Sequence, residues 1–211
     1  MAQTLYFKPD TVKIPGIFKT LLSRLAFPLL VLLSREQSLR LGLTPIDDER
    51  VIQALKHARG RLLDIGCGAN NLVRSYGNGT GADVVAWEGS DVVIEDAGKL
   101  PFEDGSYDTV SFLACLNHIP NREEALTEAF RVLRPEGQVL VTMITPRIGQ
   151  FTHWLRRPHD PDEHERHIDH DDELLGMSPN EIRSLLAEAG FKNIRRTRFV
   201  YGLNNLFTAN K

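Results

Sequence analysis

The chain has 211 residues, 42% of them hydrophobic and 25% charged, values that are typical of a globular protein and exclude disorder and fibrous repeats. Its net charge of −3 gives no global attraction to nucleic acid or to acidic membranes. Two cysteines, Cys67 and Cys115, are too few for a disulfide framework, which favours a reducing, cytoplasmic setting.

The N-terminal segment contains the most apolar run of the chain. Residues 25–33 read LAFPLLVLL, well short of the about 20 apolar residues that a membrane-spanning helix needs, and no signal-peptide cleavage site follows. We expect residues 17–41 to form a helix with a very apolar side, inside an N-terminal helical extension or lid of residues 1–44. Three roles stay open for it: packing on its own domain, the seam of a homodimer, or peripheral contact with a membrane surface or a lipid-like substrate. Residues 1–44 carry six basic and two acidic residues, an excess of +4, which keeps the membrane role open.

Beyond residue 44, short apolar runs alternate with helical patterns. Thr44-Pro45 predicts a helix start, with a capping hydroxyl before a proline, and the helical spacing continues to Gly60. Asn121, with Glu124 three positions later, resembles an acidic variant of the capping box. The predicted strands span residues 61–65, 80–84, 92–95, 108–113 and 138–144, and the predicted helices between them span about 70–76 and 121–133.

The C-terminal part opens with the clearest helix start in the chain. Residues 178–181 (SPNE) combine a capping box with proline at the first helical position, and the helix they open is expected to end at Gly190. Residues 194–201 and 206–209 predict a final hairpin. Alternating strands and helices indicate an α/β fold with a parallel sheet covered on both faces, and the hairpin requires one antiparallel strand. We expect this domain to span residues 45–211.

A glycine turn follows the first predicted strand, in the sequence DIGCGAN of residues 64–70. Glycines at such a turn let a nucleotide-like ligand approach the backbone. The third glycine of a dinucleotide-binding fingerprint is absent, because Asn71 stands at that position. Asp64, two residues before the first glycine, repels a pyrophosphate but not a cationic sulfonium amino acid. The turn therefore disfavours a nicotinamide dehydrogenase.

Two further aspartates end the next two predicted strands. Asp83 stands 17 positions after Gly66 (83 − 66), where a carboxylate can accept hydrogen bonds from both ribose hydroxyls. Asp96 can accept from an adenine amino group, with the backbone N–H of Ala97 beside the ring. The alternatives are a surface strand end for Asp83 and a helix cap or turn former for Asp96.

The segments LLDIGCG, TGAD, EDAGKLPFEDGSYDTV, HIPN and LRPEGQVLV together resemble class I S-adenosylmethionine-dependent methyltransferases, of the methyltransferase type 11 kind. The resemblance covers about residues 45–145 and implies a Rossmann-like, mostly parallel seven-stranded sheet with one antiparallel strand. It also implies an enzyme with S-adenosyl-L-methionine as its cofactor. The implied contacts are Asp64, Gly66 and Gly68, with Cys67 between them, for the methionine part; Asp83, followed by Val84, for the ribose; Asp96 and Ala97 for the adenine; and Ala114 and Cys115 for the border of methionine and substrate.

The sequence departs from that family pattern in two places. Asn70 stands where the family usually has a third glycine, and we expect cofactor binding to survive this change. Only residues 84–91 separate the second and third strands, whereas parallel neighbours normally need a crossover of about a dozen residues. The crossover helix must then be missing or reduced to a loop, which leaves Trp87 near the adenosine. We interpret Cys67 as a packing residue rather than a nucleophile.

The acceptor side is less specific in sequence. His118, after the fourth strand, is the candidate catalytic base, and the alternative is a histidine that packs or caps the backbone. A lid insertion is expected at about residues 147–177, and it contains five histidines between His153 and His170. That segment fits a solvated lid, a metal site or a supply of catalytic histidines, but no spacing in it is diagnostic, so no metal ligands are predicted.

These observations predict a methyltransferase that acts on a small-molecule or lipid- or sugar-linked acceptor, with no nucleic-acid partner. We expect residues 17–41 and the lid insertion to cover the acceptor pocket together, since ligands bind beyond the carboxyl ends of parallel strands. The alternative is a non-catalytic module that keeps the cofactor fold as a sensor or scaffold.

Overall fold

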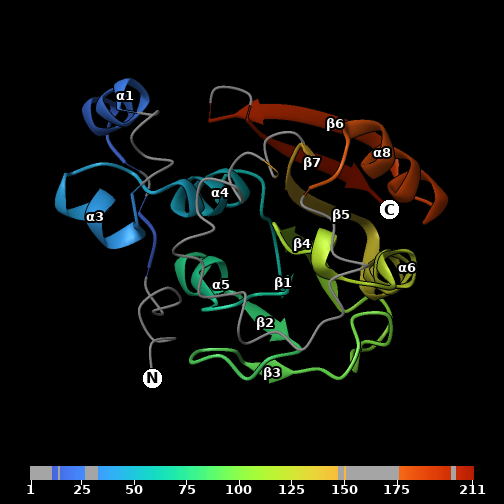
Figure 1. The fold of residues 1–211 in the computed structure, drawn as a ribbon. Helices are drawn as coiled ribbons and strands as arrows, with labels where there is room; N and C mark the ends of the chain where they lie inside the picture. Colours follow the sequence, from blue (N-terminus) through green and yellow to red (C-terminus); the bar gives the residue numbers. More distant parts are fainter. Residues whose placement is uncertain (1–10, 14, 27–32, 147–149, 151–175, 201–202) are drawn as a thin grey trace.

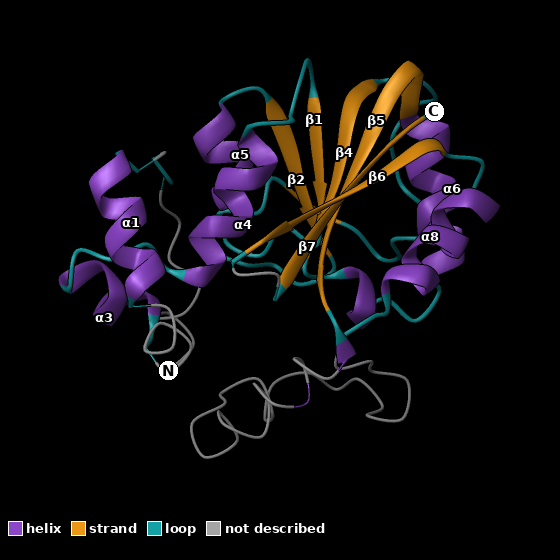
Figure 2. Cartoon of the chain, turned by 90° about the horizontal axis from the view of Figure 1, so that it is seen from above, coloured by secondary structure: helices purple, strands orange, loops and turns teal. Residues whose placement is uncertain are grey.

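The computed structural model describes residues 11–13, 15–26, 33–146, 150, 176–200 and 203–211. These residues form one seven-stranded sheet with helices on both of its faces (Figure 1). Figure 2 shows α4 and α5 on one face of the sheet and α6 and α8 on the other. The expected three-layer α/β architecture is confirmed.

The strands run in the order β3-β2-β1-β4-β5-β7-β6 across the sheet. All neighbours are parallel except β7, which is antiparallel to both β5 and β6, as the C-terminal hairpin predicts. The chain order reverses between β1 and β4, and this is the position at which open α/β sheets bind ligands. The bounds are β1 Leu62–Ile65, β2 Gly79–Asp83, β3 Val92–Val93, β4 Tyr107–Leu113, β5 Leu133–Ile144, β6 Lys192–Phe199 and β7 Asn204–Asn210.

The helices of the domain lie close to their predicted positions. α8 begins with the expected capping box, in which Ser178 accepts the backbone N–H of Glu181 and the Glu181 side chain accepts the N–H of Ser178, both at 3.2 Å. The helix bounds are α1 Ile17–Leu25, α3 Arg35–Arg40, α4 Ile46–Leu55, α5 Asn71–Tyr76, α6 Arg122–Val132 and α8 Pro179–Glu188, with a short 3-10 helix, η2, at Leu116–His118.

Alternation along the buried strands divides the core between the two faces of the sheet. Leu63 and Ile65 of β1 belong to the cluster beneath α6 and α8, and Leu62 belongs to the cluster beneath α4 and α5. Asp64 shares its face of β1 with Leu62 by the same alternation. The same face also carries Thr109 and Ser111 of β4, which align with Leu62 and Asp64, so the buried carboxylate has polar neighbours in the next strand.

Three expectations about helix ends are wrong. The helix expected at residues 17–41 is divided, because α1 ends at Leu25 and Ser34 opens α3 with a capping box of its own. Thr44 does not cap α4: Pro45 is the N-cap residue, and the Thr44 N–H donates to Ser23 instead. Asn121 makes no capping bond either, because its side chain donates to Asp96. At Thr44 and Asn121 a contact distant in sequence takes the backbone group or the side chain, whereas the new helix start at Ser34 is a local capping box.

The connection between β2 and β3 is the loop that the sequence predicts, with no helix in residues 84–91. Nearly all of the expected lid insertion at 147–177, including all five of its histidines, lies outside the described residues. Within the described ranges, no helix is both long enough and apolar enough to cross a membrane.

Candidate functional site

The glycine turn lies at the carboxyl end of β1, between β2 and β4. The Gly66 N–H donates to the carbonyl of Ala82 at 2.8 Å, which joins the turn to the end of β2. Gly66 and Gly68 have φ values of +68° and +50°, in the left-handed region that favours glycine. A Cβ on Gly66 would come within 2.6 Å of the Cβ of Cys115. Backbone conformation and the close approach of Cys115 therefore both require glycine at position 66.

Asp64 is a buried carboxylate beside this turn, only 3% exposed. The Ser111 hydroxyl donates to Asp64 Oδ1 at 2.6 Å, across the pair of aligned residues in β1 and β4. Burial raises the pKa of Asp64 to about 7, although the Ser111 hydrogen bond works in the opposite direction. Among the described residues no lysine or arginine forms an ion pair with it. The site thus favours a ligand with a positive charge next to the turn.

Asp83 connects the glycine turn to the end of β2. Its Oδ2 accepts the N–H of Gly68 at 2.9 Å, and its Oδ1 accepts the N–H of Val85 at 3.0 Å. A carboxylate oxygen has two lone pairs, so each oxygen can still accept one more hydrogen bond. Asp83 is therefore a structural link whose two oxygens keep the capacity to accept further hydrogen bonds, and its role toward a ribose stays a prediction. Val84, the next residue, is exposed.

Asp96 lies after β3 and is exposed. Its Oδ1 accepts from the side chain of Asn121 at 2.9 Å and from the N–H of Gly98 at 2.8 Å. These two bonds, the one from Asn121 most, lower the pKa of Asp96. Ala97 is buried in the core, so only its backbone can face a ligand. These two contacts fit the turn-former role of Asp96, and its role toward adenine stays a prediction.

Both cysteines are free thiols: Cys67 lies within the glycine turn, and Cys115 packs against it. Cys115 Sγ approaches the carbonyl of Ile65 at 3.0 Å, and burial raises the pKa of both thiols. A thiol with a raised pKa is a poor nucleophile, which supports the packing interpretation of Cys67. Ala114, next to Cys115, has a φ of +55°, a strained value for alanine at the end of β4.

Asn70 has a different role from the glycine it replaces. It adopts the left-handed conformation (φ 60°), which asparagine tolerates, and is buried. Its Nδ2 donates to the carbonyl of Gly89 at 2.9 Å and to Asp91 Oδ2 at 2.8 Å. The same Asp91 oxygen accepts the N–H of Gly81 at 2.8 Å. Asn70 and Asp91 therefore tie the shortened β2–β3 loop to the glycine turn and to β2.

His118 ends η2, just beyond β4. Its Nε2 lies 3.1 Å from Nδ2 of Asn117, and its backbone N–H donates to the carbonyl of Cys115 at 2.8 Å. The amide of Asn117 donates, so Nε2 is the acceptor in this arrangement. His118 lies beyond the carboxyl end of β4, at the same end of the sheet as the glycine turn, and this position is compatible with either of its two predicted roles.

Two residues of the site were missed by sequence reasoning, Ser111 and Asp91. Ser111 lies between apolar residues in the strand that ends at Leu113, and a hydroxyl flanked by Val110 and Phe112 was the available signal. Asp91 carried no such signal, because an aspartate in a loop is unremarkable in sequence.

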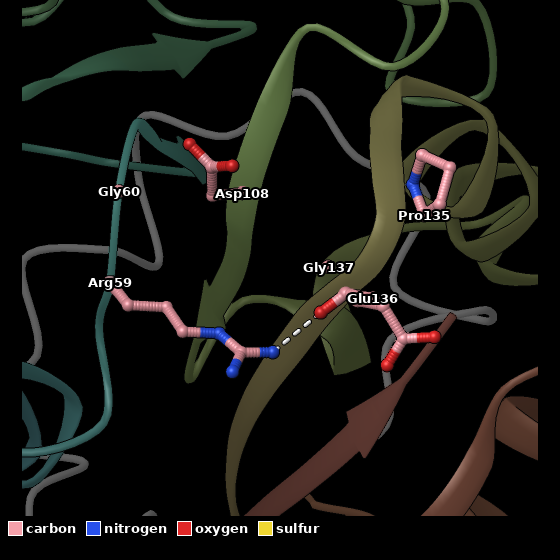
Figure 3. Close-up of a pocket in the computed structure, with 6 residues that line it drawn as sticks. All are labelled: Arg59, Gly60, Asp108, Pro135, Glu136 and Gly137. Atoms are coloured by element: carbon pink, nitrogen blue, oxygen red, sulfur yellow. Dashed lines mark hydrogen bonds between the residues drawn. The ribbon is translucent and has the colours of Figure 1, made fainter.

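A pocket of about 320 Å³ lies at the other end of the strands, just before β1 and at the beginning of β4 (Figure 3). There the guanidinium of Arg59 donates to the carbonyl of Glu136 at 2.5 Å, and Asp108 accepts from Arg134 at 3.0 Å. The amino ends of the parallel strands lie here, whereas the glycine turn follows the carboxyl end of β1. The pocket is therefore separate from the candidate cofactor site.

A family model described as a methyltransferase domain matches residues 43–196. The chain belongs to this methyltransferase family. Among curated relatives, a 24-methylenesterol C-methyltransferase of Oryza sativa subsp. japonica is 28% identical, over 72% of this chain and 47% of that protein. A ubiquinone/menaquinone biosynthesis C-methyltransferase of Burkholderia mallei is also 28% identical, over 43% of this chain and 46% of that protein. The chain thus spans about half the length of these two methyltransferases.

An uncharacterized protein of Methanocaldococcus jannaschii is 26% identical, over 71% of this chain and 74% of its own length. Solved structures agree on the fold. A SAM-dependent methyltransferase of Thermotoga maritima, titled a possible histamine N-methyltransferase, has a TM-score of 0.57 and 19% identity, covering 77% of this chain and 88% of that chain. A Haemonchus contortus phosphoethanolamine N-methyltransferase, solved with S-adenosyl-L-methionine, has a TM-score of 0.55 and 17% identity, covering 77% and 52% of the two chains. At the level of the family, the expected enzyme class and cofactor are confirmed.

Proposed function

We propose that the chain transfers the methyl group of S-adenosyl-L-methionine to a small-molecule or lipid- or sugar-linked acceptor. The observation that carries the proposal is the buried Asp64 beside the turn of Gly66 and Gly68. A carboxylate with a raised pKa and no described ion-pair partner fits the cationic amino-acid part of this cofactor. The two glycines hold the turn in the left-handed backbone conformation that glycine adopts without strain.

The proposed cofactor site extends from the turn along three strand ends. Asp83 would accept from the ribose, where its two oxygens already fix Gly68 and Val85. Trp87, in the loop that Asn70 and Asp91 hold, would lie at the adenosine. The full proposed set is Asp64, Gly66, Cys67, Gly68, Asp83, Val84, Asp96, Ala97, Ala114 and Cys115.

The bound cofactor supplies an electrophilic methyl group on a sulfonium, and the chain supplies alignment and exclusion of water. His118 is the proposed base for an acceptor that loses a proton. To take a proton at Nε2, its ring must release the amide of Asn117. An acceptor that needs no deprotonation would leave His118 a positioning role on η2.

Two observations favour an acceptor with an apolar part. The named relatives methylate a methylenesterol or act in quinone biosynthesis, and we extend that acceptor class to this chain. The exposed leucines of the N-terminal extension, residues 1–44, fit the same class. We propose that this extension and the insertion at 147–177 cover the acceptor, in a domain of residues 45–211. The free thiols of Cys67 and Cys115 fit a reducing cytoplasm.

The test offers the full chain S-adenosyl-L-methionine with a metabolite extract and measures S-adenosylhomocysteine, with the methylated product then identified by mass. An enzyme forms product only when extract is present.

Asp83→Ala should weaken cofactor binding by about 1–3 kcal/mol, the loss expected for hydrogen bonds to a charged group, as measured by calorimetry. Unchanged affinity in that variant would remove Asp83 from the site. Tight binding without turnover in any extract would instead support a sensor or scaffold.

A further inference from the structure

Helix α1 presents its apolar side to solvent. Ile17, Phe18 and Leu25 are 88%, 82% and 78% exposed, and Leu21 and Leu22 are exposed as well. At 3.6 residues per turn, these five positions fall within one arc of about 140°. A helix of a globular protein normally turns such an arc toward the core. In α1 the apolar arc faces solvent instead.

Contacts on both sides of α1 hold it in this orientation. Ser23, on the side away from the apolar arc, is buried and accepts the backbone N–H of Thr44 at 2.8 Å. Before the helix, the buried Val12 donates its N–H to Ser75 of α5 at 2.6 Å. Figures 1 and 2 both show α1 and α3 beside α4, away from the sheet. Turning the apolar arc inward would bury it only by breaking the Ser23–Thr44 hydrogen bond.

After the helix, an ion pair fixes the extension to the domain. Arg35 Nε lies 2.8 Å from Asp48 Oδ1 of α4, and both side chains are largely buried. The exposed apolar face is therefore part of a tethered extension rather than of a loose terminus.

The sequence segment that contains α1 is basic, whereas the acidic residues that follow it in the chain belong to α3 and α4. Residues 11–34 contain three basic residues, Lys13, Lys19 and Arg24, and no acidic residue, whereas the whole chain has a net charge of −3. An apolar helical face accompanied by lysine and arginine is the pattern of a helix that lies in the headgroup region of a membrane. Each basic residue near such a surface adds attraction to anionic lipids.

We propose that α1 docks on the surface of an anionic lipid bilayer. Its five exposed apolar side chains would enter the boundary between headgroups and acyl chains, with Lys13 and Lys19 at the lipid phosphates. A second copy of the chain is a poorer occupant, because a stable protein interface takes about 20–30 residues from each side and α1 has nine. The proposal rests on α1 and not on the methyl-transfer site, and docking would bring the enzyme to a lipid-linked acceptor.

The test is flotation of the full chain with vesicles of phosphatidylcholine, alone or mixed with an equal share of phosphatidylglycerol. We expect binding to the anionic vesicles that weakens at high salt. The triple variant Phe18→Ala, Leu21→Ala, Leu25→Ala should bind at least about tenfold more weakly, because it removes three large apolar side chains. These side chains are exposed, so circular dichroism and cofactor affinity should match those of the parent chain.

A matched pair of charge reversals separates local from global attraction. Lys13→Glu with Lys19→Glu should lose most of the binding, whereas Arg195→Glu with Arg198→Glu, on exposed positions of β6, makes the same change in net charge and should keep it. Failure of the parent chain to float, or equal floating of the triple variant, would overturn the proposal. So would loss of binding in both charge variants alike. A concentration-dependent dimer that the triple variant abolishes, without vesicle binding, would assign the face to a second copy. Turnover is not measured in any arm, so failure here leaves the proposed function untouched.

Discussion

The fold keeps the carboxyl group of Asp64 out of water at the end of β1 and gives it one hydroxyl donor, Ser111. Its pKa rises from 3.8 to about 7, so near neutral pH the folded protein binds a proton that the unfolded chain releases. The contribution of this group to the free energy of unfolding is therefore greatest below about pH 4 and is lost as the pH rises to 7. A cationic ligand beside Asp64 would stabilise the ionised carboxylate and so offset the stability that is lost when this buried group ionises.

Asp64→Asn should therefore stabilise the ligand-free protein at pH 8. The amide keeps the acceptor for Ser111 and removes the buried charge, and a shift of about three pKa units sets an upper limit near 4 kcal/mol. Urea unfolding at pH 4 and pH 8 measures the gain, which should be present only at the higher pH. Asp96→Asn is the matched control, because the pKa of Asp96 is lowered and its loss should not stabilise. A less stable Asp64→Asn variant at pH 8 would contradict the raised pKa.

The same carboxyl group predicts how cofactor affinity depends on pH. Binding of a cationic amino acid favours ionised Asp64, so the free protein must lose a proton first when the pH is below about 7. Affinity for S-adenosyl-L-methionine should rise about tenfold between pH 6 and pH 8 and then level off. Calorimetry across this range measures the slope, and Asp64→Asn should bind weakly with no slope. A slope that persists in that variant would place the titrating group elsewhere.

At the scale of elements, the connection between β2 and β3 is a short loop instead of a crossover helix, and hydrogen bonds attach it to the glycine turn and to β2. Asn70 and Asp91 supply these bonds, and Asp91 also accepts the N–H of Gly81 in β2. A Cβ on Gly81 would collide with the side chain of Asn70. The loop, the glycine turn and β2 are thus fitted to one another.

This fit can be measured with a double-mutant cycle. Gly81→Ala alone should destabilise by about 1–3 kcal/mol, because the added methyl group displaces Asn70 from its partners. Asn70→Gly alone should cost about 1–2 kcal/mol, through the lost hydrogen bonds, and should speed hydrogen exchange in residues 84–91. The double variant should cost less than the sum, since no asparagine side chain then occupies the space. Strict additivity of the two free-energy changes would show that the two residues do not press on each other.

The sequence predicts elements whose signals are local and misses those decided by distant partners. The capping box at Ser178, the glycine turn and the absence of a helix in residues 84–91 are all visible within a few residues, and all three predictions are confirmed. The wrong caps at Thr44 and Asn121 have suitable residue types, but the Thr44 N–H donates to Ser23 and Asn121 donates to Asp96, 21 and 25 positions away. No local pattern records such pairings.

The residues of the candidate site also fall into two groups: those that a local pattern predicts and those that only the strand alignment reveals. Asp64 and Asp83 could be found from their positions relative to Gly66, since a strand–turn–helix unit fixes where a ligand lies. Ser111 stands 47 positions from Asp64, and only the alignment of β1 with β4 reveals that the two meet. The pKa of Asp64 depends on that burial and could not be derived before the sheet order was known.

At the scale of the whole molecule, the candidate cofactor site lies within the domain, at the glycine turn of the sheet. The N-terminal extension is attached to one flank of that domain, at α4 and α5. Its described anchors to that flank are Val12, which packs on the core there and donates its N–H to Ser75, and the Arg35–Asp48 ion pair. None of the described contacts of the glycine turn involves the extension. Cofactor binding and acceptor recognition should therefore be separable by removing it.

A chain that begins at Gly42 should keep its affinity for S-adenosyl-L-methionine and lose turnover of an apolar acceptor found in the metabolite assay. Its stability should fall by about 3 kcal/mol, because Val12 no longer covers the core and the buried Asp48 loses Arg35. Adding Asp48→Asn to the shortened chain removes the buried charge and controls for that loss. A fall in kcat/KM for the apolar acceptor, with cofactor affinity unchanged in both shortened chains, would assign acceptor recognition to the extension. An unchanged kcat/KM would show that residues 1–41 serve only stability or attachment, because the remaining domain would then recognise its acceptor alone.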